Sequence, residues 1–243
     1  MKKLIITSII LTLSLSINAQ SWWNSEKVRG NGNVTTETRN TSDYESVSSA
    51  GNFDIKLVEG REGKLKLQGE ENLMKYIITE VKNGKLTIKV KKHVNLRMTK
   101  KFVVTVPYKS IDKVTLAGSG DITNSGTIKA DAFKVTLAGS GDIHLNIEVK
   151  NAVKTSIAGS GNINLSGKST ELNCSIAGSG DVNAYELKTE ATTVSVAGSG
   201  NVKTTVSKSI KARVAGSGSI YYKGKPDKID SKSFGSGSIK SRN

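Results

Sequence analysis

Residues 113–122 read Lys-Val-Thr-Leu-Ala-Gly-Ser-Gly-Asp-Ile, and close copies of this stretch recur along the rest of the chain. The spacings between the first glycines of the Gly-Ser-Gly triplets are 21, 20, 19, 20, 18 and 19 residues. A period of about 20 residues is typical of architectures in which each unit stacks on its neighbours. These repeat glycines are Gly118, Gly139, Gly159, Gly178, Gly198, Gly216 and Gly235.

Aligned on the repeat glycines, the copies form columns of similar residues. A Ser or Thr column separates two apolar columns before the triplet, and a third apolar column follows it. This alternation has the period of a β-strand with one buried face, and no copy has the apolar spacing of a helix. We expect the buried columns to be Val114, Val135, Thr155, Cys174, Val194 and Ala212; Leu116, Leu137, Ile157, Ile176, Val196, Val214 and Phe234; and Ile122, Ile143, Ile163, Val182, Val202, Ile220 and Ile239.

The sequence therefore predicts an all-β protein whose residues 111–243 form a parallel, β-helix-like β-solenoid with coils of about 20 residues. Such a unit cannot bury its own apolar face, whereas stacking at about 4.8 Å joins the columns into one core. We expect the repeat glycines to turn the corners with positive φ. The Asp or Asn after each corner should bond backbone amides or its counterparts along the stack. Cys174 replaces Val in a column and should be a buried core thiol.

Residues 28–110 are less regular and are predicted to form a β-rich half that caps the first coil. A weak copy of the repeat surrounds Phe53, but the signature is missing from there to Gly118. A helical turn is expected near 70–76, and the basic residues from 91 to 101 predict a basic loop. Alternating patterns predict strands at 53–58, 64–68, 77–81, 86–90 and 102–106.

The first 19 residues have the pattern of a secretory signal peptide. Lys2 and Lys3 precede an apolar stretch that runs from Leu4 to Ile17, and Ala19 supplies a small residue for cleavage. Residues 20–27 are then expected to be an exposed segment. The chain has no second long apolar run, which predicts an exported protein without a transmembrane segment once the signal is removed. Its location would be the periplasm, the cell surface or the medium.

Net charge indicates the kind of partner, and cysteine content excludes a disulfide. The formal net charge is +15, and removal of Lys2 and Lys3 leaves +13. A basic exported protein favours anionic surroundings, such as acidic polysaccharide or lipopolysaccharide. No feature indicates a specific nucleic acid, and another envelope protein is an alternative partner. Cys174 is the only cysteine, so no intramolecular disulfide is possible.

Several stretches, taken together, resemble one known family. They include Gly30-Asn31-Gly32-Asn33-Val34, Tyr44-Glu45-Ser46-Val47, Phe53-Asp54-Ile55, Gly69-Glu70-Glu71-Asn72-Leu73 and the Ala-Gly-Ser-Gly copies. Over about residues 28–240 the chain resembles the head GIN domain family, whose members are described as auto-transporter adhesins. The resemblance implies an exported β-solenoid of Gram-negative envelopes. It supplies no functional residues to carry over.

Two functions of different classes fit these features. The first is a non-enzymatic envelope or surface interaction protein, adhesin-like, that presents repeated polar columns to a polymeric ligand. The second is a polysaccharide-degrading β-helix enzyme, which would need two carboxylates about 5–10 Å apart. Asp121 and Asp142 could approach that spacing, but Asn or Ser takes their place in other coils. The triplets match neither a calcium nonapeptide repeat nor a phosphate loop. We therefore expect no catalytic residue, no metal and no cofactor.

One basic column is the candidate ligand surface. Lys113, Lys134 and Lys154 share a position in three successive copies, and Lys211 repeats it later. One interpretation is a solvated column that protects the sheet, because long lysine stems keep their charges in water. The other is that the column, helped by the basic residues from 91 to 101, holds a repeating anionic polymer.

Overall fold

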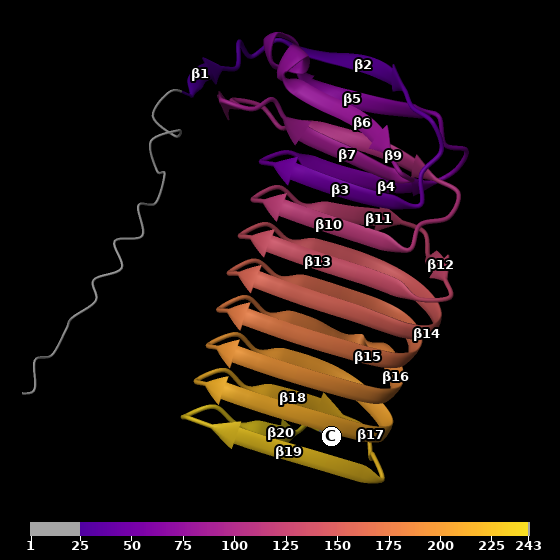
Figure 1. Ribbon diagram of the computed structural model, residues 1–243, viewed down its shortest axis with the longest axis vertical. Coiled ribbons are helices and arrows are strands. Elements are labelled where there is room, and N and C mark those ends of the chain that lie inside the picture. Colours follow the sequence, from indigo (N-terminus) through magenta and orange to yellow (C-terminus); the bar gives the residue numbers. More distant parts are fainter. Residues whose placement is uncertain (1–24, 243) are drawn as a thin grey trace, which may run out of the picture.

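The computed structural model describes residues 25–242, so the predicted signal peptide lies outside the described residues. The structure is 69% strand and 3% helix, and its parallel coils stack into a β-solenoid of about 6 turns, as the repeat predicted. Figure 1 shows the coils stacked along the long axis, with the corners along one edge and a less regular cap at the N-terminal end.

Each coil contains two facing layers that meet at the Gly-Ser-Gly corner. All pairing between successive coils is parallel. Short strands were predicted, but four coils are each assigned as one long strand, because the edge opposite the corner bends with register shifts and not with a turn. The strands are β10 Lys113–Gly118, β11 Ile122–Ser125, β12 Ile128–Ala130, β13 Phe133–Gly139, β14 Ile143–Gly159, β15 Ile163–Gly178, β16 Val182–Gly198 and β17 Val202–Gly216.

The pairing register places the predicted apolar columns in the core. Leu116 pairs with Leu137, for example, and Thr155 pairs with Cys174, which is 3% exposed. The end of the second column was predicted wrongly. Ser233 pairs with Val214 and takes the inward position, whereas Phe234 pairs with Ala215 and is 69% exposed. The last coil thus has polar residues where earlier coils have apolar ones. Its strands are β18 Ile220–Lys223, β19 Lys228–Phe234 and β20 Ile239–Ser241.

The weak repeat copy near Phe53 is a full neighbour of the first Gly-Ser-Gly coil. Strands β3 Ser46–Gly51 and β4 Asp54–Glu59 pair in parallel with β10 and β11, so Gly51 lies beside Gly118. The chain between β4 and β10 forms strands on the other side of the β3–β4 coil, where β7 pairs with β3 and β9 pairs with β4. Solenoid pairing therefore extends into the half that was predicted to be irregular.

Antiparallel strands close this end of the stack. β2 pairs with β5, β5 with β9, and β6 with β7, each in antiparallel orientation. A 3-10 helix follows β5 and buries Leu73 and Met74. The strands and the helical turn predicted for this region lie close to their expected limits. The elements are β2 Val34–Asn40, β5 Lys64–Glu70, η2 Glu71–Tyr76, β6 Ile77–Lys82, β7 Lys85–Val90 and β9 Val103–Tyr108.

A two-stranded parallel ribbon stands apart from the main sheet. It consists of β1 Glu26–Arg29 and β8 Val94–Arg97. The region predicted as a basic loop therefore contains a strand, because β1 supplies a pairing partner that no local pattern reveals. The described residues include no helix with the length and hydropathy needed to cross a membrane.

Candidate functional surfaces

The corners are built for close contact between coils. Gly159 has a φ of 132°, and a Cβ added there would lie 2.4 Å from the carbonyl oxygen of Gly139. That same oxygen accepts hydrogen bonds from the N–H groups of Ser160 and Gly161, at 2.9 and 3.0 Å. All seven repeat glycines have positive φ, between 115° and 136°. Glycine is needed here because the corners nest backbone against backbone.

A hydrogen-bond ladder follows the corners. In most coils a side-chain oxygen accepts a bond from the backbone N–H of the same position in the next coil. Asp121 Oδ1, for example, accepts from the N–H of Asp142 at 3.1 Å, and Asp142 Oδ1 accepts from the N–H and side-chain amide of Asn162 at 3.0 and 2.9 Å. The ladder consists of Asp54, Asp121, Asp142, Asn162, Asp181, Asn201, Ser219 and Ser238.

The ladder gives the acidic corner residues a structural role. Asp121 and Asp142 are the pair considered for hydrolysis. One carboxylate oxygen of each accepts a hydrogen bond from a backbone N–H of the next coil. Hydrogen bonds that cross between coils stabilise the stack and hold these side chains in fixed positions. Within residues 25–242, no group of three or more His, Cys, Asp or Glu is arranged to hold a metal ion.

The structure brings three of the four candidate lysines together. Lys113 pairs with Lys134, and Lys134 pairs with Lys154, so they are direct neighbours in adjacent coils. Lys211 occupies the same column, but Asn173 and Thr193 separate it from the others. Lys134, Lys154 and Lys211 are exposed and Lys113 is half-buried. None of the ion pairs found among residues 25–242 involves these four side chains.

Small and polar side chains flank the lysine column on one side, whereas on the other side the exposed Asp112 precedes Lys113, and its carbonyl oxygen accepts a hydrogen bond from the N–H of Lys134. Beside the lysines run the Ser/Thr column and then a column of alanines, so three coils present the sequence Lys, Ser or Thr, and Ala outward. The column continues past Ser46 to Lys85 in β7. The basic residues from 91 to 101 do not join it, because they begin where β7 ends, at the Gly51 side of the sheet. We call Lys85, Lys113, Lys134 and Lys154 the lysine column.

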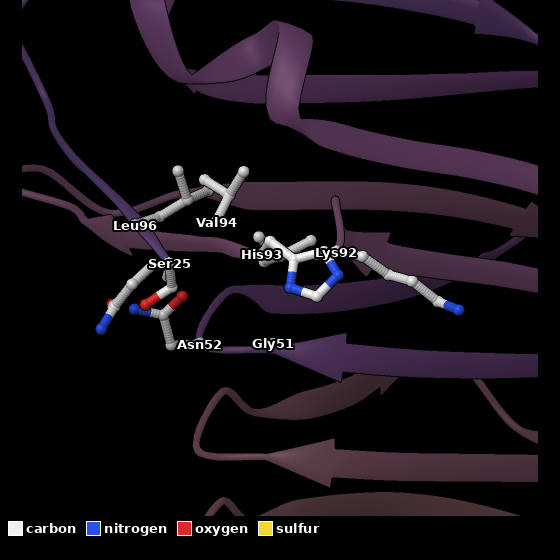
Figure 2. A pocket seen from close by; sticks show the side chains of 9 residues that line it. Ser25, Gly51, Asn52, Lys92, His93, Val94 and Leu96 are labelled. Carbon is white, nitrogen blue, oxygen red and sulfur yellow. The ribbon is translucent and has the colours of Figure 1, made fainter. Parts of the chain in front are cut away.

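Two of the basic residues from 91 to 101, Lys92 and His93, instead line an open hollow at the corner edge (Figure 2). Its volume is about 650 Å³. We call it the ribbon hollow, because it is lined by β8 of the ribbon, by Ser25 just before β1, and by the ends of β3 and β7. Its lining residues are Ser25, Gly51, Asn52, Val90, Lys92, His93, Val94, Asn95 and Leu96.

A buried carboxylate holds both chains of the ribbon in place. Glu70 is fully buried and accepts hydrogen bonds from the N–H of Gly32, which follows β1, and from the N–H and hydroxyl of Thr99, which follows β8. Burial raises the pKa of Glu70, but these bonds outweigh it and lower the pKa to about 2. The sequence marked Glu70 only as part of a family motif. Its role depends on three segments that are distant in the chain.

These features define the class of the protein: a capped parallel β-solenoid whose repeated side chains stand in columns on regular faces. The chain belongs to the family described as "Putative auto-transporter adhesin, head GIN domain", whose model matches residues 43–226. This assignment confirms the resemblance found in the sequence. The comparison with curated proteins finds no match.

Solved structures of several bacterial proteins share the fold. A "putative adhesin" from Bacteroides fragilis is 22% identical, with a TM-score of 0.84, over 88% of this chain and 100% of that one. A "putative lipid binding protein" from Parabacteroides distasonis is 27% identical, with a TM-score of 0.75, over 90% and 100%. A "putative adhesin" from Parabacteroides merdae is 23% identical, with a TM-score of 0.70, over 90% and 100%. The name of the family fits a surface interaction protein.

Proposed function

We propose that the protein is an exported, non-enzymatic interaction protein of the bacterial envelope, and that its lysine column binds an extended anionic polymer. Acidic polysaccharide or the phosphorylated glycan of lipopolysaccharide has the required chemistry. The observation that carries the proposal is the direct stacking of Lys113, Lys134 and Lys154 beside an outward column of Ser and Thr.

The geometry favours a polymer over a small ion. Neighbouring strands of a sheet lie about 4.8 Å apart, so the column offers one ammonium group per coil at a constant interval. Like charges at this spacing repel one another, and a polyanion laid along the column would relieve that repulsion. The Ser/Thr column beside it supplies hydroxyl groups that can bond to sugars. The adhesin names of the relatives support a surface role of this kind.

The test is binding of the mature protein to acidic polysaccharide and to lipopolysaccharide, with Lys113, Lys134 and Lys154 all replaced by Ser. At about 1 kcal/mol for each lysine close to an anionic surface, the triple variant should bind roughly 100-fold more weakly at low salt. Wild-type binding should fall steeply as salt is raised, because counterions compete for the polymer.

A matched control distinguishes binding by the lysine column from attraction by the net charge of the protein. Lys56, Lys203 and Lys240 are exposed lysines at outward positions of the opposite sheet, and replacing all three with Ser removes the same charge. This variant should keep most of the affinity. Equal losses in both variants would mean that net charge alone attracts the polymer. Shortening of the polysaccharide during the incubation would instead favour the hydrolase alternative.

A further inference from the structure

We propose that the ribbon hollow is a second binding site, which takes an amphipathic anion: a carboxylate or phosphate that carries a short apolar chain. This site is independent of the lysine column, because it lies at the corner edge of the solenoid and shares no residue with that column. A volume of about 650 Å³ falls within the range of about 300–1,000 Å³ that is usual for small-molecule sites.

The apolar part of the ligand would contact one side of the hollow. Val90, Val94 and Leu96 line it, and Leu96 is almost fully buried while the two valines are half-buried. Figure 2 shows Val94 and Leu96 on the β8 side, above the Gly51 end of β3. A short alkyl chain against the two half-buried valines would remove apolar surface from water on both partners, which is the main source of affinity in such sites.

The charged part would meet the basic end of the hollow. Lys92 and His93 lie side by side there in Figure 2, and none of the nine lining residues is acidic. Ser25 and Asn52 lie at the other end of the hollow, below Leu96, in Figure 2. An anion without an apolar chain would gain little at such an exposed lysine, and a neutral chain would leave the basic end unused. The combination is what the lining matches.

The hollow is held open before any ligand arrives. His93 has a φ of 61°, which is uncommon for a residue other than glycine, and its carbonyl accepts a hydrogen bond of 2.9 Å from the N–H of Glu26. Unfavourable backbone geometry of this kind is retained where the surrounding structure fixes it, and it is frequent at binding sites. Glu70 fastens the far ends of both ribbon strands. A ligand would therefore bind without the loss of conformational entropy that ordering the ribbon would require.

The experiment is calorimetric titration of the mature protein with decanoate, decyl phosphate, inorganic phosphate, acetate and neutral decanol, all kept below micelle formation. Decanoate or decyl phosphate should bind at least tenfold more tightly than the short anions and than decanol. Comparison of the two chain-bearing ligands shows which head group the site prefers. If the chain-bearing anions bind no better than inorganic phosphate, the proposal is wrong.

Two substitutions place the ligand in the hollow. Lys92→Gln should weaken binding by roughly fivefold, whereas Lys91→Gln, which removes the same charge from an exposed neighbour outside the lining, should leave it unchanged. Both side chains are exposed, so neither change threatens folding. Equal effects from the two variants would overturn the assignment. The triple variant of Lys113, Lys134 and Lys154 should bind decyl phosphate like wild type, so failure of either proposal leaves the other testable.

Discussion

Replacing Gly159 with Ala should destabilise the solenoid by about 2–5 kcal/mol. Its φ of 132° lies in a region that is almost restricted to glycine, at a cost of about 1–3 kcal/mol for other residues. The new Cβ would also lie 2.4 Å from the Gly139 carbonyl oxygen, so the corner must move. Moving it weakens the bonds from Ser160 and Gly161 to that oxygen, each worth about 0.5–1.5 kcal/mol.

Two other glycines separate the causes of this loss. Gly32 has a φ of 79° and open space around the position of a Cβ, so Gly32→Ala measures backbone strain alone. Gly161 lacks positive φ, but its Cβ would lie 2.0 Å from the Gly141 carbonyl oxygen, so Gly161→Ala measures the steric contact alone. Urea unfolding followed by far-UV circular dichroism gives the free energy of unfolding for each variant.

Gly159→Ala should lose more stability than Gly32→Ala, because it adds a steric clash to the strain. Gly161→Ala should lose a comparable amount, because its closer contact, 2.0 Å against 2.4 Å, offsets the absence of backbone strain. A Gly159→Ala protein within about 0.5 kcal/mol of wild type would show that the corners tolerate a side chain. The close nesting of the coils would then not explain the repeated glycine.

Two further predictions concern buried ionisable groups. Burial raises the pKa of the Cys174 thiol to about 12, so a thiol reagent should label Cys174 slowly in the folded protein and quickly in denaturant; rapid labelling of the folded protein would contradict the inward register. The pKa of Glu70 is lowered from 4.5 to about 2, so its carboxylate stabilises the fold above about pH 4.5, and this contribution is lost as the pH falls toward 2. Glu70→Gln should therefore lower the free energy of unfolding at neutral pH and weaken its dependence on pH between about 2 and 4.5. An unchanged pH dependence would show that Glu70 does not fix the ribbon.

The repetitive part of the fold could be predicted from the sequence because its contacts follow the repeat. Once the glycines are aligned, each residue's neighbours lie one period away in the chain, and alternation identifies the inward face. The prediction failed at Phe234, because the glycine alignment itself places Ser233 beside Val214 and Phe234 beside Ala215, in the outward column, as the structure shows. An aromatic residue near the expected column was misleading, because an end coil is not covered on both sides.

The candidate sites were harder to predict, because they depend on pairings between distant segments. The sequence identified Lys113, Lys134 and Lys154, since one period relates them. It gave no sign that Lys85 continues the column, because that contact runs through Ser46 and the return of the chain in β7. The ribbon hollow requires β1 to pair with β8, and neither strand has a marked apolar alternation.

The position of the β3–β4 coil has a consequence for the order of folding. Its two neighbours in the stack, the β7–β9 layer and the β10–β11 strands, both follow it in the chain, and Gly51 pairs with Gly118 across 67 residues. Later coils pair across one period, so their loop-closure entropy is small. The first coil closes across a longer loop, which costs about 1 kcal/mol more, so we expect its closure to follow the pairing of the repeat coils. The β3–β4 coil would then be the last to be enclosed, between two parts of the stack that each pair over shorter stretches of chain.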